Sequence, residues 1–480
     1  MSDDIGSMTL VEVAAAIRQR KLSSVEATRA CLARIERRQK VLNCFISIEP
    51  DDALAQAEQA DREIAAGRWR GPLHGAPLAH KDMFYRAGKV STCGSKIYRD
   101  HVANVTSTVQ ERMAEAGAVY LGSLNMSEFA AGPTGHNEYF GHCRNPWNPE
   151  HVTGGSSSGS GCALAARLIF ASLGSDTGGS IRLPAAMCGV VGLKPTHGLV
   201  SRYGVMPRCW SLDIVGPLAR TAEDCALLLQ VVAGPDGKDP ITAGHAIPDY
   251  HAALARGVKG MRIAVPTNAM FKDIDATVKA AHDESLRTLR TLGAEVIEVE
   301  LPDPRITYAL TNLVNKAEAA TIHAQWVRTR RDEYSLSAVN RVEAGYHIPA
   351  TQYLDATRLR ARLLQEFVQR VFDRADAVHM PVIGMPVPTI VDTEIRSTAQ
   401  VPQLMERVTR FTRWVNYLGL PALSVPCGFT PDGLPVAMQL LGRPFAEARL
   451  LALGHAYQSC TDWHKRSPPE LPASRATQRA

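Results

Sequence analysis

The 480-residue sequence lacks the features that mark several protein classes. Its ten cysteines form no Cys-x-x-Cys pair and no Cys/His spacing suited to zinc, which indicates reduced thiols and no metal site. No apolar run approaches the ~20 residues that span a bilayer, and the acidic N-terminus lacks a secretory pattern. We therefore expect a cytoplasmic protein with no membrane association.

An excess of one charge is also missing. The formal net charge is only +5, and the lysines and arginines are spread along the chain rather than gathered in blocks. This distribution argues against a nucleic-acid partner, because such partners need a concentrated basic surface. With 45% hydrophobic and 21% charged residues, the composition is that of a globular protein that buries its own core.

The order of helical and strand patterns predicts an α/β protein. Two amphipathic patterns predict helices over residues 10–20 and 24–39, the second opened by a Ser-x-x-Glu cap at Ser23 and Glu26. We predict a helical collar over residues 1–65, a main domain over 66–465, and a disordered tail rich in Pro, Ser and Ala over 466–480.

Within the main domain, short apolar segments alternate with glycine-rich loops and helical stretches. A strand, a helix and a second strand between residues 261 and 299 predict a βαβ-like unit. A long helical region follows over about 307–375. We expect one large domain, with a central mixed and twisted sheet covered by helices on both faces. The other predicted strands lie at 118–121, 170–173 and within 420–441.

Two glycine- and serine-rich segments stand out, TGGSSSGSG at 153–161 and GSDTGGSIR at 174–182. Glycine lets the backbone approach a ligand closely, and consecutive loop amides can bind an anion. A phosphate-binding loop is disfavoured because neither segment ends in Gly-Lys-Ser/Thr. A flexible linker is disfavoured because both segments are embedded in apolar sequence. The favoured interpretation is a serine-based catalytic site.

A serine nucleophile needs a base. None of the fifteen histidines has a recognised serine-hydrolase context, and His74 and His80 are more typical of structural residues. The alternative is Lys81, in LHGAPLAHKD, where an apolar run carries the lysine towards the interior. On its own, such a lysine is usually a side chain whose stem is buried while its amine reaches water.

Together, the segments HGAPLAHKD, GGSSSGS and GSDTGGSIRLPAA resemble the signature of the amidase signature family. The resemblance implies the fold of that family and a Ser, cis-Ser, Lys triad. Ser180 would be the nucleophile, Ser156 the serine after a cis peptide bond, and Lys81 the general base. It also implies an oxyanion hole built from the amides of Thr177, Gly178, Gly179 and Ser180.

The resemblance further implies supporting roles near the triad and no cofactor or metal. Ser157 is expected to bond to Lys81, Asp176 and Arg182 to support the loop, and Ala131 and Gly132 to border the substrate. We expect the loops 129–139 and 206–210 and the helical region 307–375 to form pocket walls. Homodimers are common in the family, although the sequence gives no independent sign of one.

The implied function is an amidohydrolase acting on linear amide C–N bonds of a small molecule, with esters and carbamates as alternative substrates. The second interpretation is the glutamine-hydrolysing subunit of a tRNA-dependent amidotransferase. In that subunit, an arginine binds the glutamine carboxylate and an aspartate binds its ammonium group. Arg360 matches the arginine, but Thr409 stands where the aspartate is expected. The missing carboxylate favours a free-standing amidase.

Overall fold

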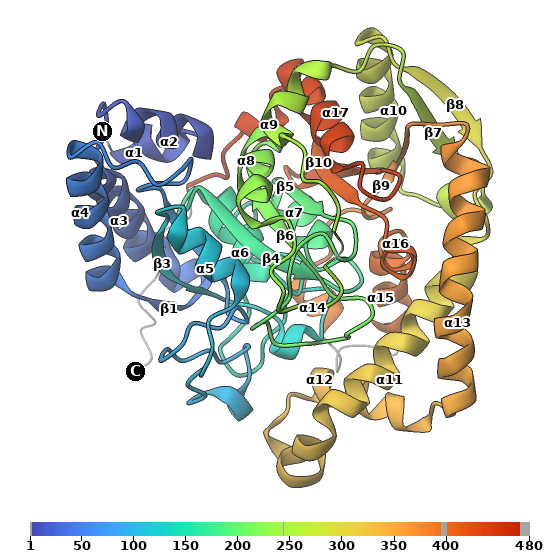
Figure 1. Ribbon diagram of the computed structural model, residues 1–480. Coiled ribbons are helices and arrows are strands. Elements are labelled where there is room, and N and C mark those ends of the chain that lie inside the picture. The colour runs from blue at the N-terminus through green and yellow to red at the C-terminus, as the bar shows by residue number, and fades with distance from the viewer. Residues whose placement is uncertain (1, 243, 395–400, 471–480) are drawn as a thin grey trace.

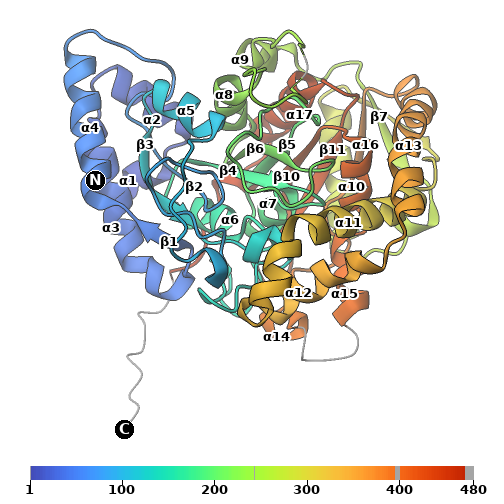
Figure 2. The ribbon, with the colours of Figure 1, turned by 60° about the horizontal axis from the view of Figure 1, so that its bottom comes forward.

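Two β-sheets lie at the centre of the computed structural model, which describes residues 2–242, 244–394 and 401–470 (Figure 1). In both views, the N-terminal helices and the long helices of the 304–367 region lie on opposite sides of these sheets (Figures 1 and 2). Of the predicted tail, residues 471–480 lie outside the described residues. No helix in the described part combines the length and apolar character needed to cross a membrane.

Four helices form the N-terminal region. Thr9 and Ser23 each cap a helix through reciprocal hydrogen bonds with a glutamate three residues later, so the predicted cap at Ser23 and Glu26 is confirmed. The third of these helices packs on the first and the fourth, and the third and fourth pack on the smaller sheet. The four helices are α1 (Ser2–Ser7), α2 (Leu10–Arg18), α3 (Ser24–Leu42) and α4 (Pro50–Ala65).

The larger sheet has eight strands among the described residues and is mixed. Its pairs are antiparallel except that β7 runs parallel to both β8 and β9. The residues of β11, and nearly all of β10, are buried, so protein covers both sheet faces there, as predicted. The spatial order is β4 (Ala171–Asp176), β6 (Ile214–Ala219), β5 (Val191–Lys194), β10 (Ala422–Phe429), β11 (Pro435–Leu441), β9 (Ala377–Pro381), β7 (Arg262–Pro266) and β8 (Glu295–Val299).

The smaller sheet was not anticipated. It contains β1 (Phe45–Ile48), β3 (Val119–Leu124) and β2 (Pro77–Lys81) in that order. β2 pairs with β3 in parallel and also packs beside β4 of the larger sheet. This contact brings the end of β2 close to the end of β4, so segments about ninety residues apart in the chain meet.

The remaining helices surround the sheets. The predicted βαβ-like unit is confirmed, because β7 and β8 pair in parallel and α10 connects them. The helices are α5 (Thr108–Glu115), α6 (Ser158–Ala165), α7 (Arg182–Cys188), α8 (Ala222–Val232), α9 (Tyr250–Ala253), α10 (Ala276–Thr291), α11 (Pro304–Arg330), α12 (Leu336–Glu343), α13 (Ala350–Phe367), α14 (Ile390–Thr393), α15 (Val401–Thr409), α16 (Arg413–Leu418) and α17 (Glu447–Ser459).

Candidate active site

The contact between β2 and β4 brings the three predicted catalytic residues into one region. Lys81 is the last residue of β2, Ser156 lies in the loop before α6, and Ser180 lies in the turn between β4 and α7. The peptide bond between Gly155 and Ser156 is cis, as the family resemblance implies. The Ser157 amide donates to the Ser180 carbonyl oxygen at 3.3 Å, which ties the two serine segments together.

The Lys81 amine is held in a dry environment. Its Nζ lies 2.6 Å from Ser156 Oγ and 2.8 Å from Ser175 Oγ, and the residue is only 1% exposed. Burial lowers the pKa of Lys81 to about 7, although the nearby carboxylates of Asp213 and Asp176 oppose this shift. A lysine with such a pKa can accept a proton near neutral pH.

The predicted bond between Ser157 and Lys81 is wrong. The Ser157 hydroxyl donates instead to the Ser175 carbonyl oxygen at 3.4 Å. The second hydroxyl at the lysine belongs to Ser175, on β4. Because β4 packs beside β2, the Ser175 side chain reaches the Lys81 amine from the neighbouring strand.

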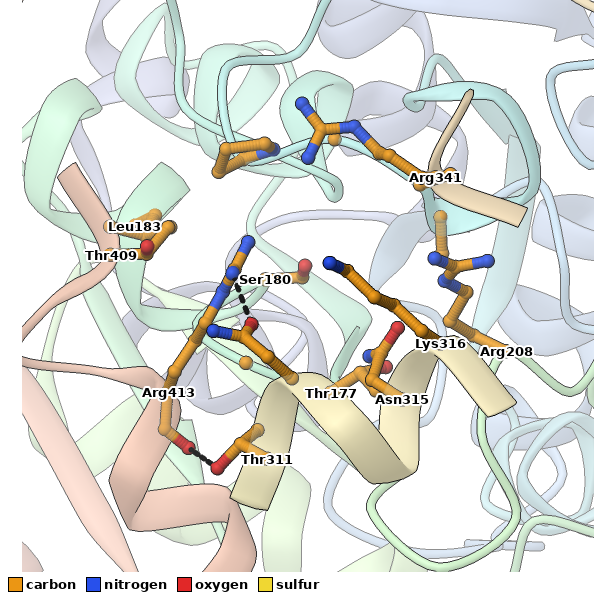
Figure 3. A pocket seen from close by; sticks show the side chains of 16 residues that line it. Thr177, Ser180, Leu183, Arg208, Thr311, Asn315, Lys316, Arg341, Thr409 and Arg413 are labelled. Atoms are coloured by element: carbon orange, nitrogen blue, oxygen red, sulfur yellow. Dashed lines mark hydrogen bonds between the residues drawn. The ribbon is translucent and has the colours of Figure 1, made fainter. Parts of the chain in front are cut away.

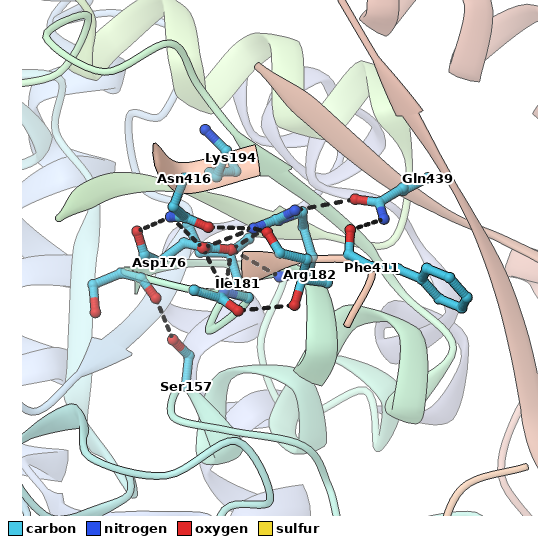
Figure 4. Close-up of polar contacts among 12 residues, drawn as sticks. Ser157, Asp176, Ile181, Arg182, Lys194, Phe411, Asn416 and Gln439 are labelled. Carbon is cyan, nitrogen blue, oxygen red and sulfur yellow. Dashed lines mark hydrogen bonds and ion pairs between the residues drawn. The ribbon is translucent and has the colours of Figure 1, made fainter. Parts of the chain in front are cut away.

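The turn that carries Ser180 is built around a buried ion pair (Figure 4). Asp176 and Arg182 are both fully buried, with Arg182 Nε 3.0 Å from Asp176 Oδ2. Burial alone would raise the pKa of the Asp176 carboxyl, but the Arg182 guanidinium lowers it well below its usual value. Asn416 and Gln439 accept further hydrogen bonds from Arg182. The predicted supporting roles of Asp176 and Arg182 agree with these contacts.

One predicted oxyanion-hole donor is already engaged. The Gly179 amide donates to Asp176 Oδ1 at 2.7 Å, so its N–H serves the turn rather than a ligand. Gly179 adopts a φ of 132°, and a Cβ there would lie 2.6 Å from Thr412 Oγ1, so only glycine fits. The other predicted donors, Thr177, Gly178 and Ser180, line a pocket that Gly179 does not reach.

This pocket opens beside Ser180 (Figure 3). Ala131 and Gly132 line it, as the resemblance implies. Each predicted wall also contributes, since the lining includes Arg208 and the α11 and α12 residues Asn312, Lys316 and Arg341. Met126 is fully buried, and the partly buried Trp326 stacks on Phe129, so neither side chain is among the residues that line this pocket.

The two positions that bear on glutamine recognition lie apart. Thr409 lines the pocket with Ser180 and shares a 3.1 Å hydrogen bond with the Tyr308 hydroxyl. Arg360 does not line it, and its Nη1 donates to the Ser211 carbonyl oxygen at 2.6 Å. The suggestion that Arg360 matches a substrate-binding arginine is therefore not supported by its position.

Comparison with known proteins decides the family. A family model described as Amidase matches residues 26–451. The chain belongs to the amidase family. It is 41% identical over 483 residues to a glutamyl-tRNA(Gln) amidotransferase subunit of Methylococcus capsulatus, covering 96% of this chain and 98% of the relative. Both the family resemblance and the predicted fold class are thereby confirmed.

Two solved structures illustrate how far the amidase fold is shared. One is a chain of a vestigial protein complex that reveals the evolutionary origins of an s-triazine catabolic enzyme. It has 33% identity and a TM-score of 0.88, covering 94% of this chain and 98% of that one. The other is a glutamyl-tRNA(Gln) amidotransferase subunit from Thermotoga maritima. It has 33% identity and a TM-score of 0.78, covering 97% and 96% of the two chains.

The predictions from sequence missed two features of the site in this amidase. Ser175 could have been noticed because it lies five residues before Ser180 in an apolar strand, where a hydroxyl needs a partner. The basic residues of the pocket, Arg208, Lys316, Arg341 and Arg413, carry no common sequence signal. They come from four separate segments, and only the packing of α11, α12 and α16 brings them together.

Proposed function

We propose that this amidase hydrolyses a small amide through an acyl-enzyme on Ser180, with Lys81 as base and Ser156 as proton relay. The observation that carries the proposal is the buried contact of 2.6 Å between Lys81 Nζ and Ser156 Oγ, beside a pocket lined by Ser180. A pKa of about 7 lets a useful fraction of Lys81 be neutral at physiological pH.

In the proposed reaction, neutral Lys81 takes the proton of Ser156 as Ser156 takes the proton of Ser180. The Ser180 oxygen attacks the amide carbonyl, and the amides of Thr177, Gly178 and Ser180 stabilise the oxyanion, a contribution of about 3 kcal/mol per donor in related sites. The relay then returns a proton to the leaving nitrogen. Water attacks the acyl-enzyme and releases the carboxylate, restoring the Ser180 hydroxyl.

A free-standing amidase is our first choice. The pocket position where a glutamine-binding aspartate is expected holds Thr409, and no Asp or Glu is among the residues that line the pocket in the described chain. The ammonium group of glutamine would therefore enter a basic pocket without a carboxylate partner, which weakens its binding. Esters and carbamates present the same carbonyl and belong in the substrate panel.

The second candidate function is the glutamine-hydrolysing subunit of a tRNA-dependent amidotransferase. The 41% identity to a subunit of that kind over nearly the whole of both chains supports it. If it is correct, this chain hydrolyses glutamine efficiently only within a larger assembly, and a small-molecule amide would be a poor substrate.

The deciding experiment compares ammonia or amine release by the purified protein from glutamine, aliphatic amides, aryl amides, carbamates and esters. Ser180→Ala serves as the inactive control, with its fold checked by circular dichroism. Turnover of simple amides without glutaminase activity supports the free-standing amidase. Glutamine as the sole substrate supports the amidotransferase assignment, and full turnover by folded Ser180→Ala would refute Ser180 as nucleophile.

A further inference from the structure

The pocket beside Ser180 gathers positive charge. Arg208, Lys316, Arg341 and Arg413 all line it, and none of the four forms an ion pair with a carboxylate in the described part of the chain. In the view of Figure 3, the Lys316 amine and the Arg413 guanidinium end on either side of the Ser180 hydroxyl. The substrate therefore meets several cations at the point of attack.

Two of these arginines have polar atoms without a partner. Arg208 is only 5% exposed, and its Nη1 is buried without a hydrogen bond in the described structure. Arg341 Nε is likewise buried and has no hydrogen-bond partner in the described structure. Burial and repulsion from Arg413 and Arg208 lower the pKa of Arg341 to about 10. Unpartnered buried donors are costly, so these groups are arranged for a ligand that accepts hydrogen bonds.

Within the described structure no carboxylate forms an ion pair with these four side chains, although the negative charge of Asp213 acts on Arg208. Asp213 accepts from the backbone amides of Arg208 and Cys209 and from the Thr177 hydroxyl, so it supports the loop rather than a guanidinium. Arg413 donates to the neutral Asn312 side chain. Three glutamates are absent from the lining of the Ser180 pocket but line an adjoining hollow that shares Lys316, Arg341 and Arg413; they are Glu138, Glu394 and Glu406.

We propose that the substrate carries a carboxylate a few bonds from the scissile amide, as in the monoamide of a short dicarboxylic acid. This inference rests on the proposed function and specifies its substrate class. The carboxylate supplies the negative charge that the pocket lacks, and a guanidinium binds it through two parallel N–H donors. Lys316, exposed on α11, adds a movable charge at the pocket wall.

The first test does not depend on finding the natural substrate. A fluorophosphonate ester labels an activated serine, and a ligand in the pocket slows labelling of Ser180. We expect succinate to slow labelling strongly, whereas the neutral butanediamide at the same concentration and ionic strength has little effect. Lys316→Gln should weaken the protection by succinate about 10-fold. Arg328→Gln, exposed on the same helix and outside the pocket lining, should leave it unchanged.

The second test compares hydrolysis of succinamate and its neutral isostere butyramide. We expect kcat/KM to favour succinamate over butyramide, and we expect Lys316→Gln to lower the ratio of the two kcat/KM values about 10-fold, mainly by raising KM for succinamate. Equal protection by succinate and butanediamide, or preference for butyramide, would overturn the carboxylate proposal while leaving an active serine hydrolase. Absence of both labelling and hydrolysis in the wild type would instead overturn the proposed function.

Discussion

Ser175 Oγ lies 2.8 Å from Lys81 Nζ, so β4 of the larger sheet and β2 of the smaller sheet meet at the amine of the proposed base. Ser175 is buried and precedes Asp176, whose carboxylate organises the turn that carries Ser180, the proposed nucleophile. The same short strand therefore positions both the lysine and Ser180. Because the lysine bridges the two sheets, its protonation state and the local packing depend on each other.

The first prediction concerns the proton relay. Ser156→Ala removes the hydroxyl that lies 2.6 Å from Lys81 Nζ, and we expect kcat to fall by about 100-fold to 10,000-fold, the usual contribution of a positioned proton-transfer group. The measurement is steady-state hydrolysis of the best amide in the panel, with Ser158→Ala, on α6, as a control for loss of a nearby buried hydroxyl. Wild-type turnover by Ser156→Ala would refute the relay.

The second prediction concerns the hydroxyl that the sequence did not reveal. Ser175→Ala removes a hydrogen bond that favours the charged amine, so the pKa of Lys81 should fall further. The acidic limb of the kcat/KM profile should then shift to lower pH, with a decrease of about 10-fold in the plateau. The control is Ser157→Ala, whose hydroxyl donates to the Ser175 carbonyl oxygen rather than contacting the Lys81 amine. Equal pH profiles for wild type and Ser175→Ala would contradict a role at the lysine.

The third prediction concerns stability and pH. Burial lowers the pKa of Lys81 to about 7, whereas an unfolded lysine titrates near 10.4. Between these pH values the unfolded chain binds more protons, so this group makes the folded state more stable as pH rises, and its full penalty applies below pH about 7.

Lys81→Met removes that titration. Relative to the wild type, its advantage in free energy of unfolding should be greatest below pH about 7 and shrink by about 1.4 kcal/mol per pH unit between about 7 and 10. Urea denaturation at a series of pH values measures the difference. A difference that does not change with pH would show that the amine is not buried as the structure indicates.

The fourth prediction concerns the buried ion pair. Asp176→Asn leaves Arg182 charged and without its partner, and should lower the free energy of unfolding by about 3–5 kcal/mol. Asp273→Asn breaks a pair with Arg410 in which the carboxylate is 79% exposed, and it is the matched control, for which a much smaller change is expected. Denaturation in urea compares the two variants. Similar small losses in both would mean that the Asp176 pair does not hold the turn.

The fifth prediction concerns specificity. Thr409→Asp places a carboxylate among the cations of the pocket, so succinate should protect Ser180 less well and glutamine should bind about 10-fold better. Thr409→Asn, with a similar shape and no charge, is the control. Ammonia release from glutamine and protection from labelling are measured on both variants. The same result for Asp and Asn would mean that charge at this position does not govern the choice of substrate.

Local sequence patterns predicted several helices and strands of this protein, because these elements depend on residues that are close together in the chain. The cap at Ser23 and Glu26, the β7–α10–β8 unit and the strands around 118–124 and 171–176 follow from spacing and alternation. Sequence motifs also marked Lys81, Ser156 and Ser180 before any contact between them was visible. The expected Ser157 contact failed because the direction of one side chain depends on how β4 packs beside β2.

The sequence by itself determined the family, the cis link before Ser156, and the three residues proposed for catalysis, because each lies in a short and distinctive segment. Only the tertiary structure decided how deeply Lys81 is buried, that Ser175 is its second partner, and that four cations line the pocket beside Ser180. Burial and charge clustering arise from segments far apart in the chain, and their free energies depend on distances that packing alone sets.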